Sequence, residues 1–282
     1  MLKNLSKNAK QYQRHLQSTI SIRKTRFDAQ YTERHYTHAT LISHFLTALS
    51  IIFPQGERFF VETVRNVRDQ IENPRLQADI SGFIGQEAHH AQAHEQFNQA
   101  VQSPHYNLMH YNAAFEKEMK RLRTLTQRRQ LAATVALEHF TALMAGYMLK
   151  YPEFMFKGLS PNMKQLWLWH AIEEIEHKHV AFEVYQTIFN HLPQRRRSMR
   201  TITIGFISST TFMTADLLWQ DRKNSLYSPQ QLFKNIKALY GLGLMMLRLS
   251  PEYFAFYRAD FHPEQLDQQE LLEQGRQLLN PS

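Results

Sequence analysis

Apolar residues recur at helical spacing along most of this chain. Positions three and four residues apart share one face of an α-helix, so this period predicts an all-α protein. Pro54 is expected to separate the first two helices, because proline removes a backbone hydrogen bond inside a helix. The expected helices cover residues 37–53, 55–71, 74–101, 115–126, 130–149 and 161–190, and two more contain residues 201–215 and 239–249.

Two of these segments have unusual apolar patterns. Residues 130–149 are apolar nearly all round, which is typical of a helix buried at the centre of a protein. Residues 201–215 carry no charge, but a membrane-spanning helix needs about 20 apolar residues. This second segment is also rich in serine and threonine. We therefore expect it to form a buried helix and not a transmembrane one.

Polar residues interrupt the apolar pattern most strongly in residues 169–183, which contain three His and four Glu. His170, Glu174 and His177 stand at i, i+4 and i+7, within a stripe of roughly 60° on one helix face. A carboxylate and two imidazoles on a buried face are costly unless a partner compensates them. A metal ion is one such partner.

Three other expected helices carry acidic residues at apolar positions, and one of them repeats the Glu-x-x-His spacing. In chain order the residues are Glu57, then Glu87 and His90, then Glu138, then Glu174 and His177. This is the order of ferritin-like dinuclear sites, where two helices supply one Glu each and two supply Glu-x-x-His. The sequence therefore predicts a ferritin-like four-helix bundle around two metal ions. Oxygen and nitrogen ligands favour iron, with manganese or zinc as alternatives.

Several assignments stay open at this point. Glu173 could replace Glu174 as ligand, since it stands four residues before His177. His170 is either a seventh ligand or a group that holds a ligand carboxylate from outside. His94 is expected beside the centre, and with Glu173 it is a candidate for proton transfer. The alternative without metal is a set of surface Glu/His pairs and a core Glu138 satisfied by neighbours.

Composition narrows the chemistry. The 282 residues include no Cys, which excludes disulfides, iron–sulfur clusters and thiolate zinc sites. Only nine Gly argue against glycine-rich nucleotide loops, whereas fifteen His agree with a metal site. The net charge of +8 suggests an anionic partner or simply a basic solvated surface. No motif supports nucleic-acid binding, so we do not expect it.

The charge pattern divides the chain into a basic N-terminal arm over residues 1–36, a bundle over 37–192 and a C-terminal helical extension over 193–282, packed on the bundle. No acidic residue precedes Asp28. The arm and residues 195–215 are candidates for contact with a membrane surface. No apolar secretory segment is seen, so a cytoplasmic location is expected, with the inner face of the membrane as an alternative. A homodimer is compatible with the sequence.

Four motifs carry a resemblance to a known family. They read F-P-x-G-E-R-F-F (53–60), G-F-I-G-Q-E-A-x-H (82–90), A-L-E-H-F-T-A (136–142) and W-H-A-I-E-E-x-E-H-K-x-V-A-F (169–182). Over most of residues 20–220 the chain resembles a bacterial family described as predicted metal-dependent hydrolases. Its ligand order is also similar to that of di-iron arylamine N-oxygenases of the ferritin-like superfamily. That similarity implies seven ligands: Glu57, Glu87, His90, Glu138, His170, Glu174 and His177.

Three functions follow as hypotheses. The ligand chemistry favours an O₂-activating di-iron oxidase or oxygenase that acts on a small apolar, aromatic or lipid-like substrate and uses an electron donor. The family description favours a hydrolase that uses a metal-bound hydroxide. The third hypothesis is iron binding or storage.

Overall fold

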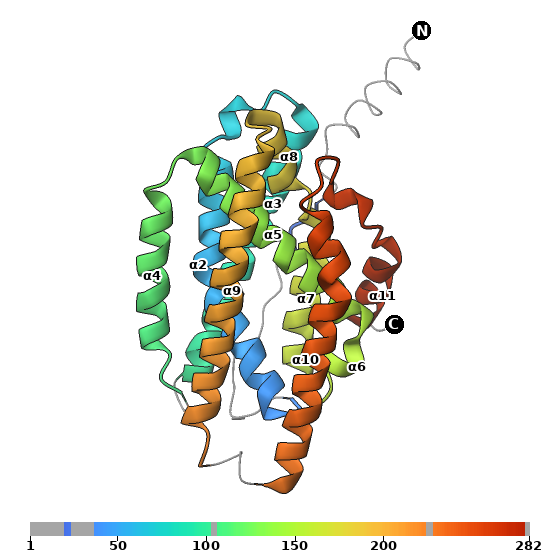
Figure 1. The fold of residues 1–282 in the computed structure, drawn as a ribbon. Coiled ribbons are helices and arrows are strands. Elements are labelled where there is room, and N and C mark those ends of the chain that lie inside the picture. The colour runs from blue at the N-terminus through green and yellow to red at the C-terminus, as the bar shows by residue number, and fades with distance from the viewer. Residues whose placement is uncertain (1–19, 24–36, 103–105, 224–227, 280–282) are drawn as a thin grey trace.

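The computed structural model describes residues 20–23, 37–102, 106–223 and 228–279. Within these ranges the chain forms helices and no strands, which confirms the predicted all-α fold (Figure 1). Most of the predicted basic arm, residues 1–36, lies outside the described residues.

Four helical layers enclose the centre of the molecule. They are formed by α2 (Thr40–Arg65), α3 (Pro74–Gln102), α5 (Gln127–Lys150) and the successive helices α7 (Pro161–His177) and α8 (Val180–Ile188). The helix α2 packs along α3, α5 packs along α7 and α8, and contacts of α2 with α5 and of α3 with α7 close the bundle. As its apolar pattern predicts, α5 is the central helix, with a buried run from Leu131 to Ala136.

The predicted break at Pro54 is wrong, because α2 continues through it as one helix. A proline at position 54 cannot donate to the carbonyl of Ser50, one turn earlier. The side chain of Asn98 on α3 supplies the missing donor, since its Nδ2 lies 2.8 Å from that carbonyl oxygen. A contact between two helices thus offsets the loss within one of them.

The predicted helix 161–190 is also wrong in detail, because it divides into α7 and α8 at Lys178 and His179. Lys178 is buried, and its Nζ donates to the carbonyl of Leu266 at 2.5 Å and to Oε1 of Gln268 at 2.8 Å. These partners lie 88 and 90 positions away, so the local pattern contains no sign of them.

The remaining helices pack outside the bundle. Their bounds are α4 Met109–Arg123, α6 Pro152–Met155, α9 Leu192–Gln220, α10 Pro229–Ala255 and α11 Gln269–Leu279, with short 3₁₀ turns at Arg68–Gln70 and Pro263–Gln265. Both α9 and α10 lie against α2 and α5, α11 lies against α5 and α7, and α4 lies against α2 (Figure 1). The limits of the predicted domains at residues 36 and 192 stay predictions.

The helix α9 corrects two expectations. It begins at Leu192 and so includes residues before the expected segment 201–215, with Pro193 in its first turn, where the missing N–H costs nothing. The expected burial of residues 201–215 is wrong for one face: Met213 is buried, but Ile204 is 72 % and Phe212 64 % exposed. Among the described helices, none is both long enough and apolar enough to cross a bilayer.

Candidate metal centre

The structure brings all seven predicted ligands together inside the bundle. Glu57 comes from α2, Glu87 and His90 from α3, Glu138 from α5, and His170, Glu174 and His177 from α7. None of the seven is more than 3 % exposed. The spacings of three, four and seven residues turn the side chains of each helix toward the same interior point.

The seven side chains form two groups that share Glu174. One group is Glu57, His90, His170 and Glu174, and the other is Glu87, Glu138, Glu174 and His177. Within each group, one ligand atom per residue lies within 4.8 Å of all the others. Ligand atoms about 2.0–2.3 Å from one ion lie at most about twice that distance apart. Each group therefore has the dimensions to hold one cation, and Glu174 can bridge the two.

Two carboxyl groups of the centre lack hydrogen-bond partners. Neither oxygen of Glu57 and neither oxygen of Glu138 accepts a hydrogen bond from any residue that the structure describes. Both side chains are buried, and an unpaired buried polar group costs roughly 1–3 kcal/mol, more when it is charged. A metal ion would replace the lost hydration, so the donors present fit a dinuclear site.

Two of the three imidazoles are oriented by a hydrogen bond to the ring nitrogen that faces away from the centre. Nε2 of His90 lies 3.1 Å from Oε2 of Glu173, which leaves Nδ1 for the centre. Nδ1 of His177 lies 2.8 Å from Oε1 of Gln86, which leaves Nε2, 2.9 Å from Oε1 of Glu87. Carboxylate and amide oxygens behind a histidine select the tautomer whose free nitrogen can bind metal.

The third imidazole is oriented by a chain of hydrogen bonds. Ser50 donates its hydroxyl proton to Oδ1 of Asn98 at 2.8 Å, so its oxygen is left to accept from Nδ1–H of His94, also at 2.8 Å. Nε2 of His94 then has only a lone pair and accepts from Nδ1–H of His170 at 2.6 Å. Nε2 of His170 is consequently a bare lone pair, and it faces Oε1 of Glu174 at 2.8 Å. The network assigns His170 a ligand's tautomer.

The same contacts separate Glu174 from Glu173, the alternative ligand. Glu174 belongs to both groups, whereas Glu173 belongs to neither and contacts His90 from behind. Nη1 of Arg23 holds Glu173 at 3.1 Å, and Arg23 also makes two bonds of 2.7 Å to Glu176. Both His94 and Glu173, the predicted proton-transfer candidates, thus hold two of the predicted ligand histidines, His170 and His90.

Burial and mutual charge shift the pKa values of the centre. Burial raises the pKa of Glu57 and Glu138 well above the usual range. Burial alone would lower the pKa of His90, but the surrounding carboxylates of Glu173, Glu174 and Glu87 together outweigh this and raise it to about 10. Burial lowers the pKa of His170 to about 4 and that of His94 well below its usual range. Both are therefore neutral at pH 7, as the hydrogen-bond chain requires.

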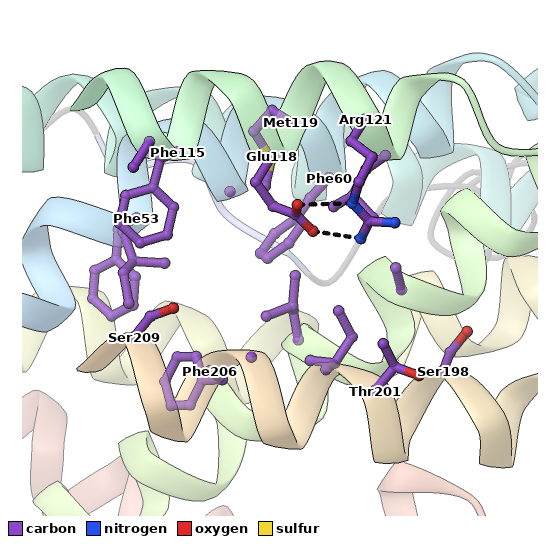
Figure 2. A pocket seen from close by; sticks show the side chains of 18 of the residues that line it. Phe53, Phe60, Phe115, Glu118, Met119, Arg121, Ser198, Thr201, Phe206 and Ser209 are labelled. Atoms are coloured by element: carbon purple, nitrogen blue, oxygen red, sulfur yellow. Dashed lines mark hydrogen bonds and ion pairs between the residues drawn. The ribbon is translucent and has the colours of Figure 1, made fainter. Parts of the chain in front are cut away.

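A cavity of about 650 Å³ lies between α2, α4, α5 and α9 and reaches the centre at Glu57. Its lining is mainly apolar, and Figure 2 shows Phe53, Phe60, Phe115 and Phe206 around it. Glu118 and Arg121 also line it but are paired with each other at 2.5 and 2.8 Å. This volume is in the range of small-molecule sites. Neither His94 nor Glu173 contributes to the lining.

Several supporting residues were not found from the sequence. Gln86 immediately precedes Glu87, but an amide next to a ligand carries no signal of its own. Ser50, Asn98 and Arg23 reach the centre through contacts between segments that are far apart in the chain. The one signal in the sequence is the i, i+4 spacing of His94 and Asn98, which places these two residues on one face of α3.

Comparison with known proteins agrees with this geometry. The model of a family described as "Predicted metal-dependent hydrolase" matches residues 21–267. No curated protein and no solved structure matches the chain. The matched region contains all seven clustered residues, so the family description and the buried ligand groups together support a metal-dependent enzyme. The chain belongs to the family of predicted metal-dependent hydrolases.

Proposed function

We propose that the protein is an enzyme with a dinuclear metal centre, held by Glu57, Glu87, His90, Glu138, His170, Glu174 and His177. The observation that carries this proposal is the pair of four-residue groups joined at Glu174. Four carboxylates balance the charge of two divalent cations, and three neutral imidazoles complete the donor set. Apart from His170, this is the donor set of ferritin-like dinuclear carboxylate sites, whose oxygen and nitrogen ligands suit iron or manganese.

The substrate is proposed to be a small apolar, aromatic or lipid-like molecule in the cavity beside Glu57. Phe53 and Phe60 would bind it by apolar contact and exclude water from the side of the centre that α2 forms. The other sides are closed by packed residues such as Phe83 and Trp169, whose rings lie against His177 and His90. Access to the metals would therefore be through the cavity.

The reaction proposed first is O₂-dependent oxidation with an external electron donor. Two iron ions would supply the redox chemistry. The protein's own residues Glu173, Gln86 and His94 would hold the three histidines in the orientation that metal binding needs. The apolar lining favours a substrate rich in hydrocarbon.

Hydrolysis is the second candidate, and the family description favours it over oxidation. It requires that water enter the cavity and that a residue protonate the leaving group. His94 and Glu173 do not line the cavity, so neither is positioned to do this without an intervening group. A storage role has no specific support.

Metal content and oxygen response would separate these proposals. The chain would be purified without chelator, its metals counted, and its absorption recorded after anaerobic reduction and again after exposure to O₂. Two irons per chain and an O₂-dependent spectrum would support oxidation. Zinc or manganese without an O₂ response, together with turnover of esters or phosphoesters, would support hydrolysis.

Matched variants test the site itself. Glu138→Gln removes a carboxylate of the second group, and we expect it to lower the metal content below that of the parent protein. Glu95→Gln on α3 is the control, because Glu95 is exposed and pairs only with Arg58 at 2.5 Å among the described residues. Absence of bound metal even after reconstitution would refute the dinuclear centre.

A further inference from the structure

Exposed apolar side chains concentrate on two helices. Of the large hydrophobic residues exposed in the described part of the chain, eight lie on α10 and four on α9, against three elsewhere. Soluble proteins rarely expose contiguous apolar patches of this kind unless they bind something. We call the outward faces of these two helices the α9–α10 surface.

On α10 the usual amphipathic pattern is reversed. Asn235, Ala238 and Met245 are buried on the side that packs on α2 and α5. On the opposite side, Ile236 is 58 %, Tyr240 69 % and Leu247 69 % exposed. A surface helix normally turns polar residues toward water. The outward face of α10 is therefore built for an apolar environment.

The helix α9 continues this surface. Ile204, Phe212 and Trp219 are each more than 60 % exposed. Both helices pack over α5, and Figure 1 shows them running along the same side of the molecule. Exposed apolar side chains thus lie on two helices that both pack on the central helix α5.

The exposed charges on these two helices all have one sign. They are Arg197, Arg200, Lys234, Lys237 and Arg248. None of the five forms an ion pair with a carboxylate that the structure describes. The acidic residues Asp216 and Glu252 on the same helices are only partly exposed. An apolar face bordered by unpaired basic side chains is complementary to a layer that has anionic groups above an apolar interior.

The basic side chains already lie along apolar neighbours. Nζ of Lys237 is 4.5 Å from the ring centre of Phe233, and the guanidinium of Arg248 is 4.7 Å from that of Tyr151. Long basic side chains arranged in this way can reach lipid phosphates while their stems remain in apolar surroundings.

We propose that the α9–α10 surface docks on an anionic lipid membrane, with α10 lying in the interfacial plane. A second copy of the chain fits this surface less well, because the same basic residues would face each other across the contact. Phe212 belongs both to this surface and to the lining of the cavity. Docking would thus place the cavity mouth beside the lipid; only this last consequence rests on the proposed enzymatic function.

Vesicle sedimentation tests the docking without reference to catalysis. The full chain would be mixed with vesicles of phosphatidylcholine containing phosphatidylglycerol, and separately with vesicles of phosphatidylcholine alone. We expect binding to the anionic vesicles, weakened by salt. The double variant Ile236→Ser/Leu247→Ser should bind at least about tenfold more weakly, because each side chain loses its apolar burial. Lys234→Gln/Lys237→Gln should bind on the order of 25-fold more weakly, at about fivefold per charge.

The control is Leu278→Ser, which removes an exposed apolar side chain from α11, a helix that packs on α5 and α7. It should leave vesicle binding unchanged, and all variants should keep the parent's circular dichroism and melting temperature. Binding that survives both double variants would overturn the proposal and assign lipid contact to another segment. Absence of vesicle binding would also overturn it. A dimer in sedimentation equilibrium that Ile236→Ser/Leu247→Ser dissociates would identify the surface as a contact between copies instead.

Discussion

Replacing His94 by phenylalanine tests the hydrogen-bond chain that orients His170. The ring of His94 already lies among Phe53, Trp167 and His170, with centroid distances between 4.7 and 5.2 Å, so phenylalanine suits its surroundings. The change removes the acceptor 2.6 Å from Nδ1 of His170. An orphaned buried donor costs about 1–3 kcal/mol. The imidazole can avoid this cost by moving its proton to Nε2, where it would block metal binding.

The expected loss of metal affinity follows from this competition between a proton and a metal ion for Nε2 of His170. Residues that hold a ligand histidine typically contribute 10- to 100-fold to metal affinity. We therefore expect His94→Phe to weaken the binding of one of two metal ions by roughly that factor, and His170→Ala to weaken it further. Ser50→Ala removes a hydrogen-bond partner of His94 but leaves His94 in contact with His170. Its effect should therefore be smaller than that of His94→Phe.

The assay is a titration of metal-free protein with Mn²⁺ or Fe²⁺ against a competing chelator, under anaerobic conditions for iron. His139→Phe is the matched control, because His139 is also buried but contacts the carbonyl of Glu252 and lies outside the centre. An unchanged affinity in both His94→Phe and His170→Ala would refute the ligand role of His170. Equal losses in His94→Phe and His139→Phe would point to general destabilisation.

Four further predictions rest on the same contacts. Glu138→Ala should bind fewer than two metal ions per chain, as counted by elemental analysis, and a variant that retains both would exclude Glu138 as a ligand. Metal binding should release protons, because the pKa of His90 is raised to about 10 and that of His177 is raised as well by Glu87 and Glu174. Calorimetry in two buffers of different ionisation enthalpy measures this release. A heat of binding that is the same in both buffers would contradict it. In metal-free protein, the stability that His90 adds is complete below its unfolded pKa near 6.5 and should be lost as the pH rises toward about 10, which denaturant unfolding at several pH values can follow. Asn98→Ala should lower the free energy of unfolding in urea by about 1–3 kcal/mol, since the carbonyl of Ser50 loses its donor. Adding Pro54→Ala should recover part of that loss, because residue 54 could then donate to the same carbonyl. Strictly additive effects of the two changes would contradict this explanation of the continuous α2.

The sequence alone was sufficient for the elements of the centre. Two Glu-x-x-His pairs and two further Glu on separate apolar helices predict a bundle with convergent ligands, because helical geometry determines which residues of one helix share a face. The central position of α5 followed from the same reasoning. Each of these inferences depends on residues within a few turns of one another.

What only the tertiary structure decided depends on contacts between distant segments. Asn98 allows α2 to continue through Pro54. Lys178 lies at the break between α7 and α8 and donates a hydrogen bond to the carbonyl of Leu266. A helical pattern does not reveal which neighbour will supply a missing hydrogen bond. For this reason both boundaries were predicted wrongly.

The choice among candidate side chains was decided in the same way. Glu173 and Glu174 are adjacent in the chain, and only the packing of α7 against α3 places the first behind His90 and the second between both ligand groups. The tautomer of His170 depends on Ser50 and His94, which reach it from two other helices. The outward apolar face of α10 is likewise a matter of packing, because periodicity shows that a helix has two faces but not which one meets the bundle.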